Sequence, residues 1–162
     1  DKWQAEGRPV ESGAEDVPSV DRPATSVRMT DIRDKTAMLA NLDGGSEQVV
    51  DARDADRFTG THEDTVHGLP GGHIPGARNL FFRDLLRDDG TFRDTENLRV
   101  LFEQAGIDLD QPVVATCGSG VTASVLLFAL RLIGAGRTAL YDGSWSEWGA
   151  DPDTPKETGE PS

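Results

Sequence analysis

The stretch that decides the fold is Val113-Val114-Ala115-Thr116-Cys117-Gly118-Ser119-Gly120-Val121-Thr122-Ala123-Ser124. Residues 112–116 form a short apolar run, which is typical of a buried strand. An apolar helix is predicted from Thr122 to Ile133, and the glycine that follows it, Gly134, ends the helix. The chain therefore passes from strand through a glycine-rich turn into a helix, and Cys117 stands at the carboxyl end of that strand.

Strand-like and helix-like segments alternate through the rest of the chain. We expect further strands at 48–52 and 138–141, a helix at 95–105 capped by Thr95, and a short helix at 145–148. Another helix is expected to open at Met29, with Thr30 as its N-cap, and to close at Gly44-Gly45. This alternation predicts an α/β fold with a central parallel sheet flanked by helices on both faces. Ligands bind such sheets at the carboxyl ends of the strands.

The length and composition are those of a single globular domain. The chain has 162 residues, with 36% hydrophobic and 28% charged residues. No apolar stretch approaches the roughly 20 residues that a membrane-spanning helix needs. The net charge of −13 argues against binding to nucleic acid or to an anionic membrane, because both would repel the protein. The acidic runs at 88–89 and 151–153 are expected to be solvated surface.

Cys117 is the single cysteine of the chain. A lone thiol forms no intramolecular disulfide and provides no cysteine cluster for zinc, so we expect no metal site. A reducing compartment, and hence a cytoplasmic location, is the expectation that follows. A single cysteine is either an inert core residue or a reactive one, and its neighbours must decide between the two.

The residues after Cys117 favour a negative charge at the centre of the turn. Gly118 and Gly120 permit backbone conformations that other residues avoid, so successive N–H groups can point inward. The helix that starts near Thr122 adds about half a positive charge at its N-terminus, and the hydroxyl groups of Ser119 and Thr122 can donate into the same space. The anion could be a thiolate or a persulfide; the alternative is a buried cysteine in a turn that is merely tight.

A phosphatase-type loop is a sharper alternative for the same pattern. That chemistry needs an arginine six residues after the cysteine to bind the phosphoryl oxygens. Ala123 occupies this position, so the turn has no fixed positive charge to meet a phosphate dianion. The sequence therefore disfavours phosphate-ester hydrolysis.

The two ends of the chain are similar to each other. A tryptophan-bearing helical segment followed by Gly and Pro occurs at 3–9 and again at 145–152. This repetition indicates that residues 1–25 are the tail of a preceding homologous domain plus a linker, although two unrelated termini would look the same. Residues 26–150 then form the main domain, and residues 151–162 form a C-terminal tail.

The turn from Cys117 to Thr122 is similar to the active-site loop of 3-mercaptopyruvate sulfurtransferases, which belong to the rhodanese superfamily. Thiosulfate-specific members carry Arg and Lys directly after the cysteine, where this chain has Gly118 and Ser119. Other segments also match the superfamily, in the same order along the chain. They are Val50-Asp51-Ala52-Arg53 with Arg57-Phe58, Gly72-His73-Ile74-Pro75-Gly76-Ala77, and Tyr141-Asp142-Gly143-Ser144-Trp145.

The resemblance implies a rhodanese-like three-layer α/β sandwich and a sulfur-transfer reaction. Cys117 would take the sulfur of 3-mercaptopyruvate as a persulfide and release pyruvate, without any other cofactor. A thioredoxin-like protein, a small thiol or cyanide would accept the sulfur. Ser119 would assist proton movement, and Gly118, Gly120, Val121 and Thr122 would bind the substrate and the persulfide anion through their backbone. In tandem members an N-terminal rhodanese domain completes the site, and it would be a partner here.

A long loop with several glycines follows the expected strand at 48–52, and the resemblance also assigns the cations and histidines of this long loop. Arg57 matches the family arginine that binds the substrate carboxylate, although a salt bridge is the alternative. Val66 stands where a second carboxylate-binding arginine is common, so the clamp is weaker, another donor is used, or His62 or His67 substitutes. We expect both of these histidines to be solvated, and we expect Arg53 and His73 to be structural.

Two alternatives to the mercaptopyruvate reaction remain at this stage. One is a sulfurtransferase that uses thiosulfate or another small donor. The other is a non-catalytic rhodanese module that carries sulfur or binds a partner, which the missing second arginine favours.

Overall fold

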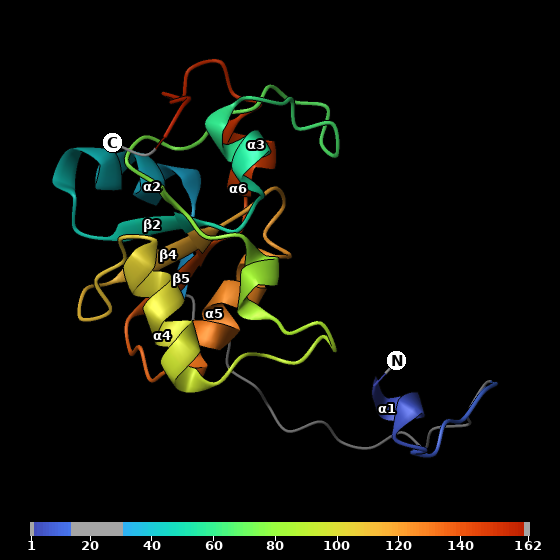
Figure 1. Ribbon diagram of the computed structural model, residues 1–162. Coiled ribbons are helices and arrows are strands. Elements are labelled where there is room, and N and C mark those ends of the chain that lie inside the picture. The colour runs from blue at the N-terminus through green and yellow to red at the C-terminus, as the bar shows by residue number, and fades with distance from the viewer. Residues whose placement is uncertain (1, 14–30, 161–162) are drawn as a thin grey trace, which may run out of the picture.

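The computed structural model describes residues 2–13 and 31–160, and its centre is a five-stranded parallel sheet (Figure 1). The strand order is β1-β5-β4-β2-β3, and every neighbouring pair is parallel. The strands are β1 (Ile32–Arg33), β2 (Gln48–Asp51), β3 (Arg78–Asn79), β4 (Val113–Thr116) and β5 (Thr138–Tyr141).

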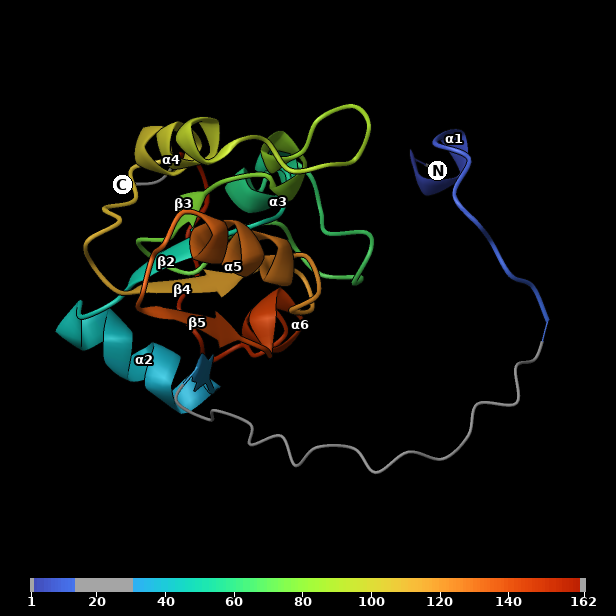
Figure 2. The same cartoon turned by 90° about the horizontal axis from the view of Figure 1, so that it is seen from below.

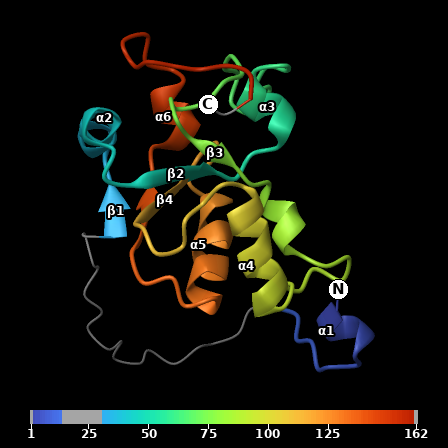
Figure 3. The ribbon, with the colours of Figure 1, turned by 60° about the vertical axis from the view of Figure 1, so that its left-hand side comes forward.

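Helices cover both faces of this sheet and make three layers, as Figure 3 shows. The larger elements on one face are α4 (Thr95–Gln104), α5 (Ala123–Leu132) and the 3₁₀ helix η2 (Phe82–Leu85). The other face carries α2 (Lys35–Gly44), α3 (Ala55–Thr59) and α6 (Ser144–Trp148). The expected three-layer sandwich with a central parallel sheet is confirmed.

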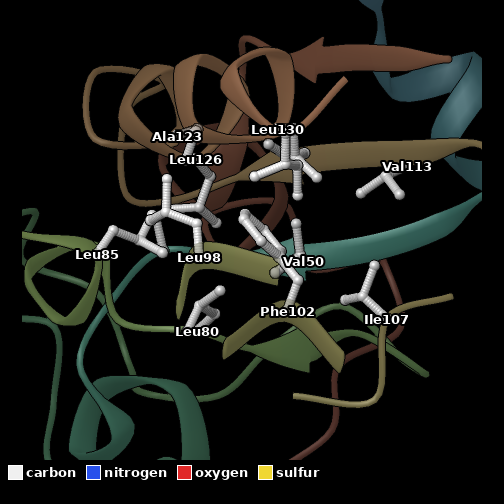
Figure 4. Packing of buried hydrophobic residues seen from close by; sticks show 14 of the residues in the cluster. Val50, Leu80, Leu85, Leu98, Phe102, Ile107, Val113, Ala123, Leu126 and Leu130 are labelled. Carbon is white, nitrogen blue, oxygen red and sulfur yellow. The ribbon is translucent and has the colours of Figure 1, made fainter. Parts of the chain in front are cut away.

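Two separate cores follow from the alternation of side chains along β4. Val113 and Ala115 face α4 and α5, where Leu98, Phe102, Leu126 and Leu130 are fully buried (Figure 4). Val114 points to the opposite face, because successive side chains of a strand alternate. The second core contains Met38, Phe58, Tyr141, Trp145 and Trp148.

The first helix of the main domain starts later than the sequence indicates. Ile32 and Arg33 form the edge strand β1 beside β5, and the N-cap is Asp34, whose carboxylate accepts a hydrogen bond from the amide of Ala37 at 2.8 Å. The predicted helix start was therefore wrong, and Thr30 lies outside the described residues. Likewise Asp94, and not Thr95, caps α4. In both helices an aspartate binds the free N–H groups, four residues after Thr30 in α2 and one residue before Thr95 in α4.

Besides β1, three short elements were not predicted: α3, β3 and η2. They lie between residues 52 and 95, where the sequence predicted no helix or strand. Each spans no more than five residues, so a periodic pattern has no room to develop.

The two chain ends carry the same local hydrogen bond. Trp148 Nε1 donates to the carbonyl of Pro155 at 2.8 Å, and Trp3 Nε1 donates to the carbonyl of Pro9 at 2.8 Å. The first bond belongs to α6. The second belongs to α1 (Lys2–Ala5), which lies outside the three layers in Figure 2 and contacts the domain through Lys2 Nζ, 3.1 Å from Asp89 Oδ2. The similarity of the two ends is thus structural as well as sequential, although the origin of residues 1–25 stays a prediction.

Residues 151–160 pack back onto the domain. The backbones of Glu157 and His73 exchange two hydrogen bonds of 2.9 and 3.0 Å. Within the described ranges, none of the helices has the length and apolar character that crossing a bilayer requires.

Two leucines of α5 provide a test of this packing. Leu130 is fully buried, whereas Leu132 is 43% exposed. Leu130→Ala is expected to lower the free energy of unfolding by about 3 kcal/mol, because it leaves a cavity in the first core. Leu132→Ala should cost less than about 1 kcal/mol. Urea denaturation of both variants measures the difference, and equal losses would contradict the assigned faces of α5.

Candidate functional site

Backbone hydrogen bonds from α6 hold the turn that follows β4. The carbonyl of Cys117 accepts from the amide of Trp145 at 2.9 Å, and the carbonyl of Gly118 accepts from the amide of Ser146 at 2.8 Å. The C=O and N–H of one trans peptide unit point in opposite directions. The N–H groups of Gly118 and Ser119 therefore point away from α6.

The amides of residues 118–122 share an unusual property. In the part of the chain that the structure describes, none of these five amides has a hydrogen-bond acceptor. Backbone N–H groups in folded proteins nearly always have a partner, whether protein, water or ligand. These amides are therefore available to an anion in the turn.

Cys117 itself is buried. The residue is only 2% exposed and belongs to the first core, which also includes Ala52 and Ala123. Its amide donates to Ser144 Oγ at 3.2 Å. The Cys117 thiol is thus buried, and the amides of the residues that follow it have no hydrogen-bond acceptor among the described residues.

The two glycines of the turn are needed for different reasons. Gly120 has φ of +82°, a conformation that favours glycine, as the sequence predicted. Gly118 has no positive φ, so the same expectation was wrong for it. A Cβ atom at Gly118 would instead lie 2.8 and 2.9 Å from Nδ1 and Nε2 of His67, and closer still to Cε1. The approach of the His67 ring is what requires glycine there.

The other predicted residues of the turn are more exposed than Cys117. Ser119 and Val121 are exposed, and Thr122 is half-buried as the N-cap of α5. Neither the Ser119 nor the Thr122 hydroxyl has a hydrogen-bond partner among residues 2–13 and 31–160. Both hydroxyl groups are therefore free to contact a ligand.

Arg57 lies on α3 and is partly buried. Its Nε donates to Asp54 Oδ2 at 2.6 Å, and its Nη1 lies 3.4 Å from Asp64 Oδ1. The salt bridge weighed as the alternative is therefore present, while Nη2 has no acceptor among the described residues. Arg57 also lines an open cleft of about 600 Å³. The other lining residues are Asp54, Asp56, His62, Glu63, Thr65 and Val66.

Arg53 is structural, as expected. It is fully buried, donates to Asp51 Oδ2 at 2.7 Å and to the carbonyl of Gly72 at 2.6 Å, and stacks over the Trp145 ring at 4.6 Å. Its Nη1 lies 3.5 Å from Asp64 Oδ2. Arg53 therefore connects β2 to both α6 and the long loop.

Asp64 is the carboxylate that organises the loop above the turn. It is fully buried, and its Oδ1 lies 2.9 Å from Nδ1 of His67. Burial alone would raise the pKa of Asp64, but the hydrogen bond from His67 and the charges of Arg57 and Arg53 outweigh it. The pKa of this carboxyl is therefore lowered from its ordinary value, and it remains a carboxylate at neutral pH.

The histidines of this region differ in their surroundings. The His62 side chain is 69% exposed beside Asp56, in agreement with the expected solvated residue. The His67 side chain is only 18% exposed, so that expectation was wrong for His67. His73 is buried and structural, as expected, because its Nδ1 lies 2.9 Å from the Phe58 carbonyl and its ring stacks on Phe58.

Sequence reasoning missed the Asp64–His67 pair as a unit. The Asp-x-x-His spacing was visible, but such pairs are common on surfaces and carry no specific signal. Only the fold places this pair against Gly118. Across the described ranges, no group of three or more His, Cys, Asp or Glu side chains is arranged to hold a metal ion.

The chain belongs to the rhodanese-like domain family, whose model matches residues 34–151. It is 38% identical over 160 residues to the 3-mercaptopyruvate sulfurtransferase of Escherichia coli (strain K12), covering 96% of this chain and 54% of that protein. It is 40% identical over 150 residues to the thiosulfate sulfurtransferase of Mus musculus, covering 90% of this chain and 49% of that protein. The chain thus spans about half the length of these curated relatives.

Two solved structures illustrate the similarity of the fold. The Tum1 protein from Saccharomyces cerevisiae superimposes with a TM-score of 0.81 at 27% identity, over 96% of this chain and 58% of that one. An EanB variant, captured as a cysteine persulfide with ergothioneine, gives a TM-score of 0.84 at 25% identity, over 98% of this chain and 39% of that one.

The buried carboxylate of Asp64 gives a stability prediction. A carboxyl with a lowered pKa stabilises the fold above the unfolded value of about 3.9, and this contribution is lost as the pH falls below that value. Asp64→Asn is expected to cost about 3 kcal/mol at pH 7, because it breaks a buried charge network. The stability of the variant should also fall less than that of the wild type when the pH is lowered, because asparagine does not titrate.

Urea denaturation between pH 7 and pH 3 measures both effects. Asp56→Asn is the matched control, since this aspartate is exposed beside His62. Equal stability and equal pH dependence in the two variants would show that Asp64 does not organise the loop.

Proposed function

We propose that this domain is a sulfurtransferase that carries sulfur as a persulfide on Cys117, with 3-mercaptopyruvate as the donor. The observation that carries the proposal is the run of five amides, residues 118–122, directly after the single cysteine, which have no acceptor in residues 2–13 and 31–160. Such a run can stabilise an anionic sulfur in a site that excludes water. The similarity to sulfurtransferases of Escherichia coli and Mus musculus supports the same chemistry.

The neutral turn favours a donor whose charge lies away from its sulfur. Gly118 and Ser119 place no cation beside Cys117. Thiosulfate has two charges close to its sulfur atoms, whereas mercaptopyruvate has a single carboxylate at the far end. Arg57 is the candidate for that carboxylate, because its Nη2 has no acceptor among the described residues.

The first half-reaction forms one bond and breaks one. The Cys117 thiolate attacks the thiol sulfur of mercaptopyruvate, an S–S bond forms, and the C–S bond breaks. The electron pair passes to the carbon, which takes a proton and leaves as pyruvate. The hydroxyl groups of Ser119 and Thr122 donate to the carbonyl of the donor. The outer sulfur then passes to a thioredoxin-like protein, a small thiol or cyanide.

The burial of Cys117 has a consequence for both steps. The S–S bond adds about 2 Å to the side chain. We propose that the outer sulfur of the persulfide lies against the amides of residues 118–122, beyond the covered Cys117 thiol. The donor would approach from the side of the turn where Ser119 and Val121 are exposed.

A preceding homologous domain is part of the proposal. The curated relatives are about twice as long as this chain, and the Trp3–Pro9 hydrogen bond repeats the Trp148–Pro155 bond that closes the present domain. We propose that residues 1–25 are the end of such a domain and its linker, and that this domain completes the donor site.

The proposal predicts a single modified residue. Treatment with mercaptopyruvate should add one sulfur atom to the chain, and Cys117→Ser should abolish the addition while the protein remains folded. Intact-mass spectrometry measures the addition, and circular dichroism checks the fold. An unchanged mass of the full-length protein with every small donor would reject the enzyme, and sulfur uptake from a protein donor alone would favour a carrier module.

The absent second arginine predicts a gain of function. Val66 is 72% exposed and lines the same cleft as Arg57. Val66→Arg is expected to lower the KM for mercaptopyruvate about tenfold, since a charged hydrogen bond contributes about 1.5 kcal/mol or more. Steady-state kinetics of the full-length protein measure this change.

Val66→Gln is the matched control, because it adds similar length without charge. An equal effect of the two substitutions, or a KM that Val66→Arg does not lower, would contradict the proposed carboxylate site.

A further inference from the structure

The His67 side chain, from the loop between β2 and β3, lies against the turn that follows Cys117. The imidazole lies over Gly118, at a distance that leaves no room for a Cβ atom there. Because Gly118 has no positive φ, the backbone itself would accept alanine. The close approach is therefore a specific fit between this ring and the residue that follows Cys117.

The orientation of the ring is fixed from behind. Asp64 is a carboxylate and can only accept, so the proton on Nδ1 of His67 donates to Oδ1 at 2.9 Å. Nε2 is then the ring nitrogen that can accept a proton, and it has no partner among the described residues. A carboxylate that orients a histidine beside a nucleophile is the arrangement by which proteins prepare a proton carrier.

The charges around this pair keep the carboxylate in place. Arg53 Nη1 lies 3.5 Å from Asp64 Oδ2, and Arg57 Nη1 lies 3.4 Å from Asp64 Oδ1. Asp64 Oδ2 is buried and makes no hydrogen bond within the described ranges. The two arginines thus hold the charge of Asp64 in place behind the His67 ring.

We propose that His67 is the proton carrier of the sulfur-transfer reaction at Cys117. This inference rests on the proposed function and adds a residue to it. His67 links the place of the donor carboxylate, at Arg57, to the turn that holds the sulfur, because Asp64 binds both side chains.

The proton balance defines the role. The thiol of Cys117 first gives one proton to His67 Nε2, directly or through one water, and the resulting thiolate bonds to the sulfur of mercaptopyruvate. The C–S bond breaks, and its electron pair forms the enolate of pyruvate. The enolate carbon then takes the proton back from Nε2. The products are pyruvate and the Cys117 persulfide, and the imidazole returns neutral.

His67→Ala separates this role from a structural one. The substitution should lower kcat for mercaptopyruvate about 100-fold with a much smaller change in KM, as loss of a general acid–base predicts. It also opens space over Gly118 that free imidazole can fill. Added imidazole should therefore restore kcat of this variant in a saturable manner, measured as pyruvate release by the full-length protein.

Two variants serve as controls for the rescue. His62→Ala removes the exposed histidine of the same loop and should gain no dependence on imidazole. Cys117→Ser should remain inactive with imidazole present. Wild-type protein that gains no sulfur on Cys117 would reject the proposed function itself. Wild-type turnover combined with an unimpaired His67→Ala, or with an impaired variant that imidazole does not restore, would reject the role of His67 alone.

A second pair of variants tests the contact independently of activity. Gly118→Ala should destabilise the wild-type protein and should be tolerated in the His67→Ala background, because the colliding ring is gone. Thermal unfolding of the two single variants and the double variant measures the coupling. Additive changes would show that His67 does not lie against Gly118, and the proposal would fail with it.

Discussion

The site depends on two backbone hydrogen bonds that join α6 to the turn after β4. The amides of Trp145 and Ser146 bind the carbonyls of Cys117 and Gly118, and this sets the direction of the peptide groups that follow. Helix α6 can do so because both of its tryptophans are buried in the second core and Arg53 stacks on Trp145. The core on one face of the sheet thus determines which way the amides of the turn point.

The regular part of the fold was predictable because its segments are long or strongly apolar. The strands β2, β4 and β5 and the helices α4 and α5 match the expected segments to within one or two residues. The edge strand at Ile32–Arg33 was not predictable, since its two residues are extended only because β5 lies beside them. The short elements between β2 and α4 depend in the same way on contacts with the folded sheet.

The site was predictable only in part, for a similar reason. The spacing of strand, cysteine and glycines placed Cys117 at the carboxyl edge of the sheet, and the α6 segment was recognised by its resemblance. The role of Gly118 was not predictable, because it depends on His67, which the fold brings from a distant loop. The sequence alone did not decide whether Arg57 binds substrate or forms ion pairs, since an arginine at this position fits both roles. The structure shows its ion pairs with Asp54 and Asp64.

The central claim is that the amides of residues 118–122 hold an anionic sulfur on Cys117. The most direct measurement is the amide proton chemical shifts of these residues, by NMR, before and after sulfur is loaded onto Cys117. The account predicts downfield shifts concentrated in residues 118–122, as new hydrogen bonds to the sulfur form. Unchanged shifts in these five residues, in a protein whose mass confirms the added sulfur, would contradict it.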